Sequence, residues 1–192
     1  MNNIKNKIET YTSKLTKCLD LILLPNVEVF FNDVLNLWSE KKALFICGNG
    51  GSAGNANHIV NDLIYGVAMQ HGKGINAISL ASNPSVITCL ANDINYDVIF
   101  SEQLAVHGKP GDHLLVLSGS GNSPNIIKVI QTAKKMGIKS HGIIGFDGGE
   151  AKRILDNAIH IKINDMQISE DFQLIICHML MQWLHEKNEI NE

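Results

Sequence analysis

Short continuous apolar runs alternate with segments of helical spacing from residue 43 onward. A short apolar run is typical of a strand buried on both faces, whereas apolar residues three and four positions apart indicate a helix. Their alternation predicts a parallel sheet covered by helices on both faces. The expected strands are 43–47, 75–80, 114–117, 142–144 and 159–163, and the expected helices are 53–68, 84–91, 98–106, 124–136, 149–156 and 168–187.

Two amphipathic segments precede this region. Residues 4–24 carry Ile4, Ile8 and Tyr11 at helical spacing, and Pro25 should end that helix because proline disfavours a helical residue before it. A second helix is expected over 27–40. We therefore predict one domain over residues 1–192, with residues 1–40 as N-terminal helices and residues 41–192 as a five-stranded α/β core.

Composition excludes several classes of function. The net charge is −3, so the chain lacks the basic surplus of a nucleic-acid-binding protein. No apolar run approaches the roughly 20 residues of a membrane span, and the polar N-terminus does not resemble a signal peptide. Cys47, Cys89 and Cys177 each lie in an apolar run, which predicts buried thiols in a reducing compartment. We expect a cytoplasmic protein without nucleic-acid or membrane partners.

A glycine-rich loop follows the first expected strand. It comprises residues 48–54, and it includes Asn49, Gly50, Gly51 and Ser52. Glycine permits close approach of the backbone to a ligand, and the N–H groups at the start of the next helix form an anion site. The structural alternative is a tight turn that merely requires glycine.

A second polar loop, residues 118–125, directly follows the strand at 114–117. Ser123 could cap the helix that Pro124 begins, but capping would not account for Ser118 and Ser120. Ligands of open parallel sheets bind beyond the carboxyl ends of the strands. Two such loops therefore predict a phosphate cradle built from backbone and hydroxyl groups, without lysine or arginine.

Four motifs together resemble the sugar isomerase (SIS) family, specifically its single-domain phosphoheptose isomerases. They are GNGGSAGNANH (48–58), LAND (90–93), LSGSGNSPN (117–125) and GFDGGE (145–150). The resemblance implies a flavodoxin-like three-layer αβα sandwich and a homotetramer. It also implies isomerisation of sedoheptulose 7-phosphate, a ketose, to an aldose heptose 7-phosphate for surface polysaccharide, either lipopolysaccharide or capsule.

The same resemblance assigns site residues. Asp62 and His178 would move the proton, and zinc would be the metal. If metal is absent, Asp62 or Glu170 would serve as base and His178 as acid. The implied metal ligands are His58, Asp62, Glu170 and His178, and the implied substrate-binding residues are Asn49, Gly50, Gly51, Ser52, Asp93, Ser118, Gly119, Ser120 and Ser123.

Structural alternatives remain for each metal candidate, since a lone helical histidine is more often structural, Asp62 could be a surface carboxylate and His178 a core histidine. The chain also departs from the family pattern. Asp62 replaces a glutamate, Glu170 a glutamine and Gly119 a threonine, and an arginine has no counterpart in 64–67. Two other functions stay open: a non-catalytic regulatory protein, such as a partner of the replication initiator, and a phosphosugar sensor. Retention of the acid/base set favours the isomerase.

Overall fold

The computed structural model describes residues 2–22 and 24–187. Its centre is a five-stranded parallel sheet with the strand order β2-β1-β3-β4-β5. Every residue of β1 is buried, as expected for an apolar run covered on both faces. The strands are β1 (Ala43–Gly48), β2 (Asn76–Ser79), β3 (His113–Ser118), β4 (Lys139–Ile144) and β5 (Asn157–His160).

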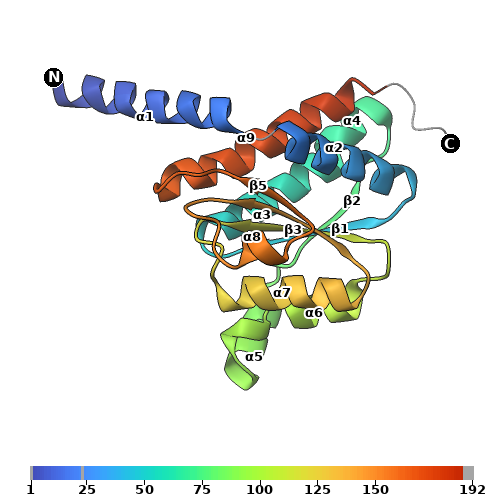
Figure 1. Ribbon diagram of the computed structural model, residues 1–192. Coiled ribbons are helices and arrows are strands. Elements are labelled where there is room, and N and C mark those ends of the chain that lie inside the picture. Colours follow the sequence, from blue (N-terminus) through green and yellow to red (C-terminus); the bar gives the residue numbers. More distant parts are fainter. Residues whose placement is uncertain (1, 23, 188–192) are drawn as a thin grey trace.

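Helices cover both faces and complete the predicted three-layer αβα sandwich (Figure 1). Successive residues of β1 point to opposite faces, so Leu44 and Ile46 join one core while Phe45 and Cys47 join the other. The first core lies under α2 (Leu24–Ser39), α3 (Gly51–Asn61), α4 (Val67–His71) and α9 (Met166–His185), and the second under α6 (Ser101–His107), α7 (Pro124–Lys135) and α8 (Ala151–Ile154).

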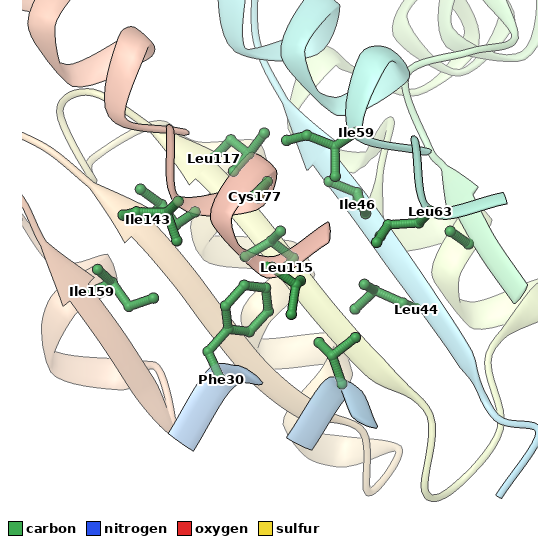
Figure 2. Packing of buried hydrophobic residues seen from close by; sticks show 14 of the residues in the cluster. Phe30, Leu44, Ile46, Ile59, Leu63, Leu115, Leu117, Ile143, Ile159 and Cys177 are labelled. Atoms are coloured by element: carbon green, nitrogen blue, oxygen red, sulfur yellow. The ribbon is translucent and has the colours of Figure 1, made fainter. Parts of the chain in front are cut away.

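The first core fixes the two helices that carry the candidate site. Ile59 of α3 and Cys177 of α9 pack with Leu115 and Leu117 of β3, and Phe30 of α2 closes the same cluster (Figure 2). Burying one such aliphatic or aromatic side chain stabilises the fold by about 1.5–3 kcal/mol. The shared cluster therefore holds α3 beside α9 on one face of the sheet.

The strand order creates a crevice at the carboxyl ends of β1 and β3. The chain runs from β1 to β2 on one side and then returns to β3 on the other, and Gly48 pairs with Leu117. Ligands of doubly wound sheets bind at such a reversal of strand order. The topology thus places both predicted loops, 48–54 and 118–125, at one site.

The helix expected over 53–68 is interrupted by one π-helical turn, Asp62–Gly66. In a regular α-helix the N–H of Val67 would bond the carbonyl of Leu63. Here the Leu63 carbonyl accepts from the N–H of Ile75 at 2.9 Å, and Val67 bonds Asp62 instead. The hydrogen bond from Ile75, which follows the helix in the chain, thus accompanies the wider π-helical turn. Sequence periodicity does not predict this turn.

The N-terminal helix α1 (Asn2–Leu21) extends away from the sandwich (Figure 1). Tyr11 donates a hydrogen bond to Asp171 at 2.5 Å, and Lys14 pairs with Asp165 at 2.6 Å, so the middle of α1 is tied to the start of α9. Pro25 lies in the first turn of α2, a position that proline tolerates. Within 2–22 and 24–187, no helix combines the length and apolarity required to span a membrane.

The prediction that Cys89 is buried was wrong. Cys89 lies on α5 (Pro84–Asp93), a helix that projects from the sandwich and none of whose residues, all described, is buried (Figure 1). Ile87, Leu90 and Ala91 of this helix pack, partly buried, against the second core, whereas Cys89 faces solvent. Cys47 and Cys177 are buried as expected, and desolvation raises the pKa of both thiols.

Candidate functional site

The loops after β1 and β3 enclose a cavity of about 240 Å³. None of the described residues that line it is lysine or arginine, so an anion there would be bound by hydroxyl and N–H groups. The lining includes all the predicted substrate-binding residues except Asp93; it comprises Asn49, Gly50, Gly51, Ser52, Leu117, Ser118, Gly119, Ser120, Ser123, Met166 and Glu170.

Glycines let the first loop close tightly over the start of α3. Gly50 has φ 56°, a left-handed conformation that favours glycine. A Cβ on Gly48 would lie 2.7 Å from the Cβ of Ser52, so only glycine allows β1 to approach the helix so closely. Gly51 and Ser52, the first residues of α3, line the cavity. The dipole of a helix favours an anion at its N-terminus.

The serine hydroxyls of the second loop are held by backbone N–H groups. The Oγ of Ser118 accepts a hydrogen bond from Gly121 at 3.0 Å, and that of Ser120 accepts from Asn122 at 3.2 Å. Ser123 occupies the N-cap position of α7, yet its side chain makes no capping bond. Its predicted capping role is therefore not realised, and its side chain lines the cavity.

Asn49 joins the two loops. Its side-chain amide exchanges two hydrogen bonds with that of Asn125, at 2.9 and 2.8 Å, and the hydroxyl of Tyr96 also donates to its Oδ1 at 3.1 Å. Asn125 lies in the LSGSGNSPN motif, but no role is predicted from the sequence for either Asn125 or Tyr96. No spacing rule could have found these pairings, because each joins segments far apart in the chain.

Asp93, which the family resemblance places at the sugar, is not among the residues that line the cavity. It ends the projecting helix α5, where its carboxylate is exposed. Hydrogen bonds from Asn92 and Cys89 hold the pKa of Asp93 below its ordinary value. Within one chain, this residue belongs to α5 rather than to the cradle.

Three of the four predicted metal ligands lie together. The Nε2 atoms of His58 and His178 are 3.0 Å apart, and the Oδ2 atom of Asp62 is 3.4 Å from each. Ligand atoms around tetrahedral zinc, with bonds of about 2.0–2.1 Å, are separated by about 3.3 Å. This donor set and spacing fit zinc. Asp62 is the first residue of the π-helical turn.

Glu170, the fourth predicted ligand, is not part of this cluster. Its carboxylate lines the cavity, and a Cβ on Gly51 would lie only 2.5 Å from its Oε1. Glu170 and His178 are two turns apart on α9, about 12 Å at 1.5 Å per residue. The cavity and the His58–Asp62–His178 cluster thus lie at different points along the pair α3 and α9.

A second group of possible ligands lies toward the amino-terminal ends of β3 and β4: Asp33, His113 and His141. Lys139 pairs with Asp33 at 2.7 Å, and the amide nitrogen of Asn157 lies 3.3 Å from the Nδ1 of buried His141. Desolvation, followed by the neighbouring His113, lowers the pKa of His141. These contacts describe a neutral histidine within a hydrogen-bonded network.

Comparison with known proteins identifies the family of the chain. Residues 11–145 match the SIS domain. The chain belongs to the SIS domain family. Among curated members of the family, the probable phosphoheptose isomerase of Thermoplasma volcanium is 33% identical over 173 residues, 90% of this chain and 88% of the relative. The phosphoheptose isomerase of Helicobacter pylori strain HPAG1 is 36% identical over 177 residues, 92% and 91% of the two chains.

Solved structures of family members share the fold. A phosphoheptose isomerase from Francisella tularensis superposes with a TM-score of 0.89 at 22% identity, and it covers 97% of this chain and 98% of its own. The phosphoheptose isomerase from Neisseria gonorrhoeae gives a TM-score of 0.85 over 94% and 98% of the two chains. The three-layer sandwich is therefore the family fold.

Proposed function

We propose that this chain is a phosphoheptose isomerase that converts sedoheptulose 7-phosphate into a heptose 7-phosphate. Relatives of that name align over about nine-tenths of the chain, as the Thermoplasma and Helicobacter proteins do. The structural observation that carries the proposal is the arrangement along α3 and α9. A cavity of about 240 Å³ lies near the start of both helices, and a cluster of acid/base side chains lies about two turns further on.

The spacing of these two sites suits a linear sugar phosphate. Ser52 and His58 are six residues apart on α3, which corresponds to about 9 Å along the helix axis. The phosphate and the carbonyl end of an extended heptose 7-phosphate are separated by a comparable length. With the phosphate in the cavity, the reacting carbons would lie near the His58–Asp62–His178 cluster.

The proposed reaction moves one proton between neighbouring carbons through an enediol. If no metal is bound, Asp62 would accept the proton from one carbon as general base and return it to the other, and His178 would exchange a proton with the adjacent sugar oxygen. The contacts of 3.4 Å from Asp62 to both histidines hold the carboxylate beside its partners. Both His58 and His178 are partly exposed, so substrate can reach them.

We propose zinc as the metal of this cluster, held by His58, Asp62 and His178. Their imidazole and carboxylate atoms are ligands that zinc prefers, and their mutual distances fit it. Bound zinc would act as a Lewis acid that polarises the sugar carbonyl. Glu170 remains near the phosphate cavity, where it would limit which phosphosugars fit.

Assembly into a homotetramer is also part of the proposal. Helix α1 carries Ile4 and Ile8 at 74% and 61% exposure, and the projecting helix α5 ends beside exposed Ile94 and Tyr96. Ile4 and Ile8 lie one turn apart on α1 and could contribute to a contiguous apolar patch, the kind of surface that another subunit covers. Association would also place residues such as Asp93 near a neighbouring chain.

The experiment that tests the function is turnover of sedoheptulose 7-phosphate, followed by proton NMR, after chelation and after addition of zinc. We expect a heptose 7-phosphate product. His178→Ala should lower kcat at least 100-fold while phosphosugar affinity changes less than fivefold, because the phosphate cradle is intact. His107→Ala, an exposed histidine at the end of α6, is the control and should match the unaltered protein. Saturable binding without product would contradict the isomerase and favour a binding role.

A further inference from the structure

Gln173 lies behind the phosphate cavity, on α9, and its exposure is 0%. It is flanked by the buried side chains of Phe172 and Ile176 on the apolar side of the helix. A polar group in such surroundings is costly unless it is hydrogen-bonded. Both ends of the Gln173 amide are bonded: its Nε2 donates to the Oγ of Ser52 at 3.0 Å, and its Oε1 accepts from Asn55 at 2.9 Å.

The direction of these hydrogen bonds is set by a backbone carbonyl. The Nδ2 of Asn55 also lies 3.1 Å from the carbonyl oxygen of Glu170, which can only accept. Asn55 must therefore present its amino group, Gln173 must turn its oxygen toward Asn55, and the Gln173 amino group must face Ser52. The Ser52 oxygen is consequently the acceptor in its contact with Gln173.

The direction of the hydrogen bond between Gln173 and Ser52 determines whether Ser52 can donate to an anion. A serine hydroxyl has one hydrogen and two lone pairs. Since Gln173 occupies a lone pair of Ser52, the hydroxyl hydrogen is left to donate into the cavity that Ser52 lines. Ser118 and Ser120 have the same polarity, because each accepts a backbone N–H. A cradle without lysine or arginine in its described lining depends on such donors.

We propose that Gln173 is a positioning residue that makes Ser52 a hydrogen-bond donor to the phosphate of the substrate. The inference rests on the proposed function, since it assumes that the phosphate binds in this cavity. It names a determinant of phosphate affinity that contacts no substrate and that neither loop motif contains.

Two substitutions test the direction of the bond. Gln173→Glu keeps the shape but offers only acceptors when ionised, so Ser52 would donate to Glu and turn its hydrogen away from the cavity. Gln173→Met keeps the approximate volume and removes both bonds. Isothermal titration with inorganic phosphate and with sedoheptulose 7-phosphate should show at least 30-fold weaker binding for Gln173→Glu and about three- to tenfold weaker binding for Gln173→Met. KM should rise while kcat changes less than threefold.

The controls separate positioning from loss of structure. Gln103→Glu makes the same chemical change beside the other core, where Gln103 donates to the carbonyls of Leu80 and Ile99, and phosphate affinity should stay within twofold. Thermal melts identify any variant that fails to fold. In a Ser52→Ala background, Gln173→Met should weaken binding by less than twofold, because the group that Gln173 orients is gone.

The outcomes distinguish this inference from the proposed function. If Ser52→Ala weakens phosphate binding but Gln173→Met does not, the positioning role is wrong and the cradle stands. The positioning role is equally wrong if Gln173→Met causes the same loss with and without the Ser52 hydroxyl. If Ser52→Ala binds phosphate as well as the unaltered protein does, or if no phosphosugar binds, both the cradle and the inference fall.

Discussion

Two glycines of α3 offer a matched pair of substitutions that separate stability from function. A Cβ on Gly54 would meet no atom within 4 Å, and Gly54 lies in the helix interior. Alanine there should therefore stabilise the protein by about 0.5–1 kcal/mol, through reduced chain entropy and better helix propensity. In a protein of this size, that gain raises Tm by about 1–4 °C.

Gly51→Ala adds the same methyl group one turn earlier, with a different result. The new Cβ would lie 2.5 and 2.6 Å from the two carboxylate oxygens of Glu170. The carboxylate is the end of a flexible side chain and can rotate away, at about 0.5–1.5 kcal/mol for an unfavourable rotamer. The helical gain offsets most of this, so the free energy of unfolding should stay within about 1 kcal/mol of the original.

Function should nevertheless diverge between the two variants. Gly51 and Glu170 both line the phosphate cavity, so Gly51→Ala narrows it and displaces the carboxylate. We expect kcat/KM for sedoheptulose 7-phosphate to fall at least tenfold, equivalent to about 1.4 kcal/mol, whereas Gly54→Ala should stay within twofold. Circular dichroism melts and NMR turnover on the same samples give both quantities. Unchanged turnover in Gly51→Ala would refute the assignment of this cavity to the substrate.

Two further predictions concern capping and pH. Ser123→Ala should change the free energy of unfolding by less than about 0.5 kcal/mol, because Ser123 makes no capping bond, but it should weaken phosphate binding several-fold. Asn83→Ala removes the cap to Ser85 and Val86, so it should destabilise the fold by about 1 kcal/mol and leave phosphate binding unchanged. Urea unfolding and phosphate titration of both variants distinguish these effects. His141 should make the free energy of unfolding sensitive to acid. Burial lowers the pKa of His141 below the ordinary 6.5, so on acidification the unfolded chain takes up the proton before the folded chain does. The stability that neutral His141 contributes is therefore complete above pH 6.5 and is lost as the pH falls below that value. Urea unfolding from pH 8 to 5 should show this slope, and His141→Gln should flatten it; an unchanged slope would contradict the assignment.

The sheet and both loops were predictable because their causes are local. Continuous apolar runs such as 43–47 are buried whichever helices cover them, and glycine and serine at 48–54 and 118–125 directly follow strands. The i and i+4 spacing of His58 and Asp62 likewise fixed their shared helix face. Family resemblance added His178, which the fold brings to the same cluster.

The remaining features depend on long-range contacts. Cys89 lies in an apolar run, but Ile87, Leu90 and Ala91 are the residues of that run that pack against the second core, and Cys89 stays exposed. The π-helical turn requires the N–H of Ile75, well beyond the helix that it alters. In the sequence, Gln173 is one of several polar residues on an amphipathic helix. Its contacts with Ser52 and Asn55 depend on the packing of α3 against α9. Asp93 remains a predicted substrate residue that the single chain keeps outside the cavity.

The reciprocal amide pair of Asn49 and Asn125 has a thermodynamic consequence for ligand binding. Each amide both donates and accepts, so the two loops are fastened together by the protein itself. Ordering a mobile side chain at a binding site costs about 0.5–1.5 kcal/mol, and ordering a loop costs more. Here the two loops are held together before an anion enters, so association should require little of this ordering.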